Sequence, residues 1–192
     1  MFRLFGILIF GLLLSACQVL SSTAAKDSVP MAGGSYRLYP GWPGPDQQWL
    51  QHIQWRNGTK THEFMLSASL TEHSILLVGM SPLGQELWRL SYDETGGLQT
   101  AGVEPFNDPE FASRVLAEMQ LALLPMELLE PRLTKLRMTE ALTSNYQRRL
   151  IDAEGGEVLS IIWKGEPEPQ RLIELTQAHY QLIITTLEVE ML

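Results

Sequence analysis

The sequence is poor in cysteine and in positive charge. Cys17 is the only cysteine among 192 residues. One thiol cannot form an internal disulfide, so Cys17 needs another explanation. The chain has 14 Lys and Arg residues against 22 Asp and Glu residues, a formal net charge of −8. An acidic protein has little Coulombic attraction to phosphate backbones, and we therefore expect no nucleic-acid partner.

The start of the chain has an apolar run that is too short to cross a bilayer. Residues 4–14 are apolar apart from two glycines, about 11 residues where a spanning helix needs about 20. Arg3 precedes this run and small residues follow it, an order that is typical of a secretory signal peptide. We therefore predict that residues 1–16 are a signal peptide.

These small residues lead directly into the cysteine as Leu14-Ser15-Ala16-Cys17. This motif resembles the lipobox of bacterial lipoproteins. The resemblance implies cleavage before Cys17 and acylation of both its thiol and its new amino group, so that covalent lipid anchors the protein to a membrane. Enteric lipoproteins that stay in the inner membrane commonly carry aspartate after the cysteine, so Gln18 favours the periplasmic face of the outer membrane. The alternative is an ordinary signal peptide that happens to contain a cysteine.

The predicted mature chain divides into a tether and one domain. Residues 17–45 hold the lipidated cysteine and a stretch that is small, polar and without periodicity, and we expect this stretch to hold the domain off the membrane. Three prolines between Tyr39 and Pro45 exclude a helix or an inner strand there, and Trp42 is expected to cover an end of the core. Residues 46–192 have the length of one ordinary domain.

Short strand signals recur through this domain. Residues 63–70, for example, alternate between apolar and more polar side chains with the period of two that indicates a half-buried strand. Gly155-Gly156 is a hairpin signal between two such segments. The predicted strands are residues 47–55, 63–70, 75–78, 88–92, 98–103, 136–142, 146–151, 158–163, 172–175 and 180–189.

The pattern changes at Asp108-Pro109, which is typical of a helix start. Apolar residues then recur at helical spacing as far as Leu124, and Pro125 ends the predicted helix. One main helix among antiparallel strands predicts an α+β fold. In this fold a curved sheet is closed on its concave side by the helix, with an apolar pocket between them.

Residues for catalysis or metal binding do not come together in the sequence. No histidine has a close metal-ligand spacing to another. The segment 79–84 is one residue too long for a Gly-x-Ser-x-Gly nucleophile elbow and leads from strand to strand. Glu166 and Glu168 lie in a proline-stiffened loop without the pocket that acid–base work needs. We expect no enzyme, no metal, and no cofactor beyond the lipid on Cys17.

Residues 75–87, which contain Ser81-Pro82-Leu83-Gly84, resemble the strand–turn–strand unit of the lipoprotein carriers LolA and LolB. Residues 117–125 and 180–188 resemble small outer-membrane lipoproteins of the LolB-like type, often encoded with aryl-polyene biosynthesis enzymes. The resemblance covers most of residues 47–190. It implies a LolA/LolB-like open antiparallel β half-barrel covered by one main helix.

The same resemblance implies a cavity that holds acyl chains and hands over a lipid-bearing cargo. In LolB the leucine of the Pro-Leu-Gly turn projects into water and helps insert the cargo into the membrane. Carried over by its motif, that residue is Leu83. The candidate cavity-lining residues are Leu66, Leu77, Trp88 and Leu90 from the sheet, and Leu116 and Met119 from the helix.

We therefore predict a monomeric, non-catalytic carrier or acceptor of a lipid or another amphiphile, with a periplasmic carrier protein as a partner. The alternative is a structural or interaction lipoprotein that docks a partner protein at the outer membrane. A carrier should contain an apolar void of several hundred Å³. A docking protein should instead be packed to crystal-like density by its own side chains.

Overall fold

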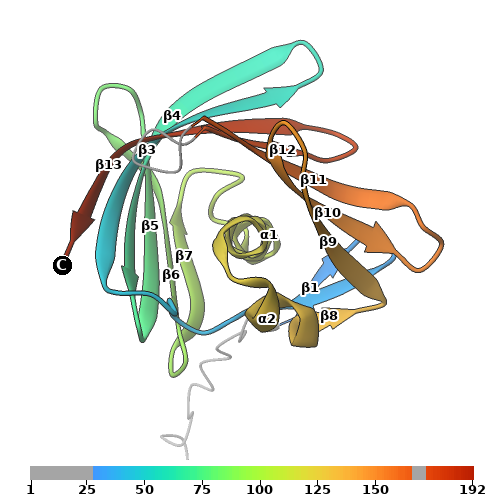
Figure 1. Cartoon of the computed structure of the whole chain (residues 1–192). Helices are drawn as coiled ribbons and strands as arrows, with labels where there is room; N and C mark the ends of the chain where they lie inside the picture. Colours follow the sequence, from blue (N-terminus) through green and yellow to red (C-terminus); the bar gives the residue numbers. More distant parts are fainter. Residues whose placement is uncertain (1–27, 166–171) are drawn as a thin grey trace, which may run out of the picture.

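The computed structural model describes residues 28–165 and 172–192, and most of them belong to one antiparallel sheet of ten strands. The sheet curves around a central helix (Figure 1). Its strand order is β7-β6-β5-β4-β3-β13-β12-β11-β10-β9. The strands are β3 (Gln47–Asn57), β4 (Lys60–Thr71), β5 (Ser74–Met80), β6 (Glu86–Asp93), β7 (Gly97–Gly102), β9 (Leu136–Leu142), β10 (Tyr146–Asp152), β11 (Glu157–Lys164), β12 (Leu172–Thr176) and β13 (Gln181–Met191).

Each half of this sheet is a meander, and one pairing between distant parts of the chain joins the halves. β3 pairs with β13 antiparallel, from Gln47 opposite Met191 to Arg56 opposite Gln181. The strand order ends at β7 on one side and at β9 on the other. The predicted α+β architecture, antiparallel strands with one main helix, is confirmed at this level.

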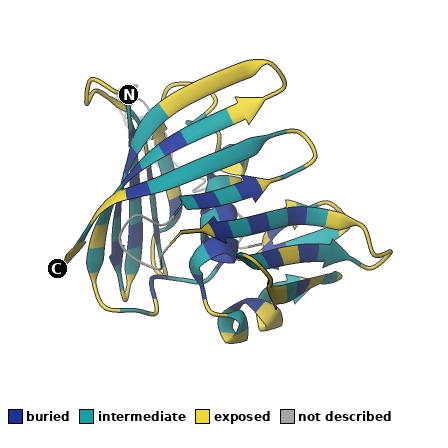
Figure 2. Ribbon diagram, turned by 45° about the horizontal axis from the view of Figure 1, so that its top comes forward, coloured by how far each residue is buried: buried dark blue, intermediate teal, exposed yellow. Residues whose placement is uncertain are grey.

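The strands alternate between the two faces of the sheet because successive side chains point in opposite directions. Along β5, every second residue from Ile75 to Gly79 is buried, whereas the residues between them are partly exposed. Figure 2 shows the resulting bands of buried and exposed residues along the strands. The buried positions of the ten strands therefore face the helix and form the core with it.

The main helix, α1 (Pro109–Leu123), begins where the sequence predicts. Asp108 Oδ1 accepts a hydrogen bond from the Glu110 amide at 2.8 Å, and Pro109, at the first helical position, has no N–H that would need a partner. Leu124 leaves the helical conformation because the next residue is proline. A short helix, α2 (Met126–Leu129), and a 3-10 turn, η1 (Glu130–Arg132), follow. Across the two described ranges, no helix has both the length and the apolarity needed to cross a membrane.

A second sheet forms where the sequence predicts a tether. β1 (Ser28–Met31), β2 (Gly34–Arg37) and β8 (Leu133–Thr134) pair in this order. The prediction of a tether over residues 17–45 therefore has to be corrected for residues 28–45. Strands of four residues, rich in small and polar side chains, carry too little period-two signal to be recognised, and β2 pairs with a segment almost 100 residues away.

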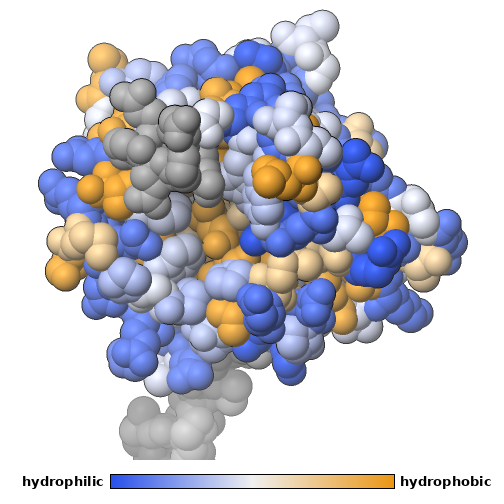
Figure 3. Space-filling model, in the orientation of Figure 1, coloured by the Kyte–Doolittle hydropathy of each residue, from blue (hydrophilic) through white to orange (hydrophobic). Residues whose placement is uncertain are grey.

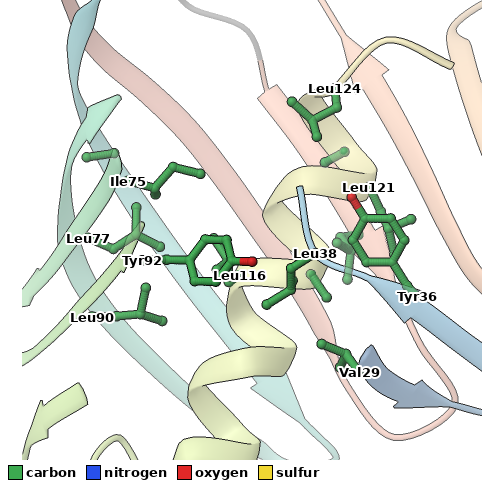
Figure 4. Packing of buried hydrophobic residues seen from close by; sticks show 14 of the residues in the cluster. Val29, Tyr36, Leu38, Ile75, Leu77, Leu90, Tyr92, Leu116, Leu121 and Leu124 are labelled. Carbon is green, nitrogen blue, oxygen red and sulfur yellow. The ribbon is translucent and has the colours of Figure 1, made fainter. Parts of the chain in front are cut away.

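Buried side chains from this N-terminal segment complete the core. Tyr36 and Leu38 are buried beside Leu116 and Leu121 of α1 (Figure 4). Trp42 is also buried, as predicted, and its ring packs edge-on against Trp49 with centroids 5.6 Å apart. The domain therefore starts well before residue 46.

Gln120 ties α1 to this N-terminal segment. Its side chain is fully buried, and Oε1 accepts hydrogen bonds from the Tyr36 hydroxyl at 3.0 Å and the Tyr39 amide at 2.9 Å. Gln120 Nε2 donates to the Tyr39 carbonyl oxygen at 2.7 Å. A buried amide whose donor and acceptor are both used stabilises one arrangement of the two segments.

Arg148 of β10 ties the C-terminal end of α1 to the sheet. Its Nη1 donates to the carbonyl oxygens of Leu121, Ala122 and Leu124, at 3.0, 3.2 and 2.7 Å. Its Nε donates to Glu140 Oε1 at 2.6 Å. A cation placed here satisfies orphan carbonyl groups and opposes the negative end of the helix dipole. These contacts fix the depth of α1 in the concave face.

Candidate functional site

A pocket opens between α1 and the concave face of the sheet, and its walls are almost entirely apolar. The walls enclose a cavity of about 140 Å³, and the whole recess measures about 990 Å³ when the solvent-filled space at its mouth is included. The larger volume counts open solvent, so the smaller one describes the space that the walls enclose. Figure 3, drawn from the side of Figure 1, shows apolar surface near the middle of this face.

One wall of the pocket is a cluster of aromatic rings. The Trp88 and Phe106 rings stack with centroids 5.3 Å apart. Phe64 meets both rings edge-on, and Phe111 meets Phe106 edge-on at 5.1 Å. The missing side chain of Gly79 leaves room for the Trp88 indole, because a Cβ atom at Gly79 would lie 2.1 Å from Trp88 Nε1. The wall therefore combines β4, β6, the segment after β7 and the first turn of α1.

The adjoining wall is aliphatic and comes from the two strands at the centre of the sheet and the strand beside them, with Ile53 paired directly with Phe64 of the aromatic wall. Ile53 of β3, Ile184 of β13 and Ile173 of β12 all line the pocket. Register places Ile53 opposite Ile184 and Ile184 opposite Ile173, so the three side chains form a row across the sheet. Met119 and Val115 of α1 also line the pocket.

Glu118 is the acidic group among the described lining residues, and it is only 4% exposed. Its Oε1 accepts hydrogen bonds from the Tyr180 hydroxyl and from Gln177 Nε2, the latter at 2.7 Å. Burial raises the pKa of Glu118 to about 7, although the Tyr180 bond, the charge of Arg114 and the Gln177 bond each lower it. Burial and the neighbouring Glu118 also raise the pKa of Tyr180. The pocket therefore contains a buried carboxyl group whose pKa lies near neutral pH.

Two further polar side chains line the pocket. Arg114 lies one turn before Glu118 on α1 and is exposed. Gln51 of β3 is buried, and its Nε2 donates to Thr186 Oγ1 of β13 at 3.1 Å. Both Gln51 and Glu118 have hydrogen-bond partners in the protein. Glu118 is the stronger candidate for a polar contact with a ligand because it is the acidic group among the described lining residues.

The structure brings together half of the lining residues that the sequence suggested. Leu66, Trp88 and Met119 line the pocket. Leu77, Leu90 and Leu116 do not, since they are packed in the filled part of the core, where Leu77 and Leu90 lie on the side of Tyr92 and Leu116 lies between Tyr92 and Leu38 (Figure 4). The prediction for these three residues is corrected accordingly. All six are inward-facing, but inward-facing residues line a pocket only where no other segment fills the space.

Leu83 stands at the tip of the β5–β6 hairpin and is 96% exposed. The turn is closed by the Gly84 amide, which donates to the Ser81 carbonyl oxygen at 2.8 Å. Gly84 has φ +80°, a conformation that favours glycine. The geometry thus presents the leucine to solvent, and a role in membrane insertion stays a prediction.

Other predicted features fall outside the described residues or show no grouping within them. The signal peptide, Cys17, Gln18 and the Glu166 and Glu168 pair lie outside residues 28–165 and 172–192. In the part of the chain that the structure describes, no three His, Cys, Asp or Glu side chains gather in a way that could hold a metal ion. His52 Nε2 lies 3.5 Å from Glu63 Oε2, and both side chains are partly exposed.

Sequence reasoning missed Phe106, Phe111, Glu118 and Tyr180 as pocket residues. Glu118 carries a signal that could have been used, because it is an acidic residue in a helical turn between the apolar positions Val115 and Met119. Phe106 carries none, since its segment lies between elements and has no periodicity. Its place over Trp88 depends on the tertiary structure.

Comparison with known proteins adds one match. The sequence model of the family described as "Protein of unknown function (DUF3261)" matches residues 48–188, which include β4 to β12 and most of β3 and β13. No curated protein matches the chain. The matched region contains every residue of the pocket.

Proposed function

The chain belongs to the DUF3261 family, and we propose that it binds and hands over a lipid or another amphiphile in the pocket beneath α1. The observation that carries the proposal is the pocket itself, which has apolar walls that the chain does not fill with its own side chains. The mechanism is passive. Each cargo methylene that enters the pocket contributes about 0.8 kcal/mol by leaving water, so binding and release need no catalytic group.

The enclosed volume suggests how a cargo would sit. A dry apolar cavity of roughly 150 Å³ is large enough for a benzene-sized group, and the pocket encloses about 140 Å³. The end of an acyl chain or a ring fits this space, and a longer chain extends through the mouth. Only one end of the apolar chain of the cargo is therefore enclosed, and the cargo can dissociate again.

The location and the delivery step belong to the same proposal. The lipobox resemblance at Cys17 supports a lipid anchor, and Gln18 supports the periplasmic face of the outer membrane. A LolA/LolB-like half-barrel that receives cargo from a periplasmic carrier protein is consistent with the curved open sheet. The exposed Leu83 supports insertion of the hairpin tip into the membrane at delivery.

A second function, a non-carrier lipoprotein that docks a partner protein, is favoured by one observation. The enclosed 140 Å³ is smaller than the several hundred Å³ typical of ligand pockets. In this second function the pocket would be a packing defect, and the exposed surface would carry the activity.

Native mass spectrometry on residues 18–192, exported without the anchor and purified without detergent, tests the proposal. This chain contains every described element. A bound species of lipid mass that organic solvent releases would support the carrier function. An empty protein that also takes up no fluorescent fatty-acid probe would refute it and leave the docking function.

A further inference from the structure

We propose that the Glu118 side of the pocket binds a hydrogen-bond-donating group of the cargo, an amine in preference to a carboxylate, while the apolar portion lies against the aromatic wall. The inference rests on the proposed function, since it specifies the cargo of the same pocket. It assigns a ligand class to Glu118, Tyr180 and their surroundings.

The first argument is the unequal use of the two carboxylate oxygens of Glu118. Tyr180 and Gln177 both donate to Oε1. Oε2 accepts no hydrogen bond from any residue in the ranges 28–165 and 172–192, although Glu118 is 4% exposed and lines the pocket. Oε2 is not one of the buried, unpartnered side-chain atoms of the described residues, which are the indole nitrogens of Trp42, Trp49 and Trp88, so solvent in the pocket reaches it. A ligand N–H or O–H group placed in the pocket can take the place of this solvent as the donor to Oε2.

The second argument is charge. The titratable and charged groups that act on Glu118 are Tyr180 and Arg114. The Tyr180 proton is already used on Glu118, so the hydroxyl has none left for an anionic ligand. Arg114 is exposed, and water screens its charge. A ligand carboxylate at Oε2 would therefore meet a like charge, whereas an ammonium group would form a charge-assisted hydrogen bond.

The third argument is the division of the pocket into unlike sides. Phe64, Trp88 and Phe106 form one wall. Among the described lining residues, β4 and β6 contribute no charged side chain to it. Near Glu118, the Trp55 and Tyr180 rings pack edge-on at 6.4 Å and both line the pocket. Aromatic rings attract cations, so this side accommodates an ammonium group better than a carboxylate.

The test compares three probes with the same alkyl chain: an alkylamine, an alkanol and an alkanoate. Each is titrated into residues 18–192 by displacement of a fluorescent fatty-acid probe, at a pH above the pKa of Glu118. We expect the alkylamine to bind roughly tenfold more tightly than the alkanoate, the ratio that one charge-assisted hydrogen bond supplies. Glu118→Gln should reduce this ratio by roughly tenfold, and it should weaken alkanol binding by less than it weakens alkylamine binding, because the glutamine amide oxygen still accepts a hydrogen bond but carries no charge. Glu110→Gln, an exposed change on the same helix, should preserve the ratio.

A second variant guards against loss of folding in Glu118→Gln. Tyr180→Phe keeps the ring and leaves Glu118 with more unused acceptor capacity, so the preference for the amine should be kept or increased. Equal binding of all three probes, with no change in either variant, would overturn the inference and leave the carrier function standing. Failure of every probe to bind would instead overturn the carrier function itself.

Discussion

The two faces of α1 differ in how the space between the helix and the rest of the domain is filled. On one face, which we call the closed end, Tyr36 and Leu38 from the N-terminal segment lie beside Leu116 and are buried with it (Figure 4). On the other face, which we call the open end, Phe106 and Phe111 line the pocket, and a cavity of about 140 Å³ is left. Apolar side chains face inward on both.

The comparison shows that alternation along the strands does not decide where a pocket forms. Alternation determines which side chains face inward, and it holds equally at both ends. A pocket remains where no distant segment reaches the interior. The closed end therefore carries the stability of the domain, and the open end is free to bind a ligand.

The largest expected effect comes from truncating a side chain at the closed end. Leu116 is fully buried, so Leu116→Ala should lower the free energy of unfolding by about 3–5 kcal/mol. Val115→Ala, which removes a side chain that already faces the pocket, should lower it by about 1 kcal/mol. Urea denaturation of both variants measures the difference. Equal losses would show that the two ends do not differ in packing.

The next effect comes from releasing the anchored end of α1. Arg148 is 7% exposed, and Arg148→Met leaves three helix carbonyls and Glu140 without their partner. We expect a loss of about 3 kcal/mol in the free energy of unfolding and faster hydrogen exchange in the last turn of α1. The control is Arg149→Met, which changes an exposed residue and should alter stability by less than about 0.5 kcal/mol. Similar losses of stability in both variants would show that Arg148 does not anchor α1 to the sheet.

At the open end, Glu118 should make stability depend on pH. Its pKa rises from 4.5 to about 7 on folding, so the folded state holds the proton more tightly than the unfolded state. This stabilisation is fully present below the unfolded pKa and is lost as the pH rises through about 7, with a total of up to about 3 kcal/mol.

Urea denaturation across this pH range checks the prediction. Glu118→Gln should show a flatter profile than the unaltered protein between about pH 5 and about pH 8, whereas Glu110→Gln should keep the original profile. A Glu118→Gln profile that parallels the original one would show that Glu118 titrates as an exposed carboxyl group does.

The smallest effect on stability is expected at the hairpin tips. Leu83 and Leu142 are 96% and 81% exposed, so replacing either with Glu should change the free energy of unfolding by less than about 0.5 kcal/mol. If Leu83 inserts into the membrane, Leu83→Glu alone should slow transfer of a fluorescent fatty-acid probe from the protein to vesicles. Equal transfer rates for both variants would count against a role for that turn.

Sequence reasoning predicted the large sheet and the helix well because their signals are local. β9 has the predicted bounds, residues 136–142, and α1 starts at the predicted Asp108-Pro109. The small sheet was missed, since β1 and β2 are four residues long and depend on β8 for a partner. Leu66 lines the pocket and Leu77 does not, although both obey the same alternation.

By itself the sequence determined the periodicity of each element, the capping of α1 and the positions of the hairpins, because these follow from interactions between residues close together in the chain. Only the tertiary structure decided that Tyr36 fills one end of the interior, that Phe106 covers Trp88, and that Glu118 is buried beside Tyr180. Each of these contacts joins segments that are distant in sequence or without periodicity. A local pattern therefore cannot specify them, and the candidate pocket depends on all three.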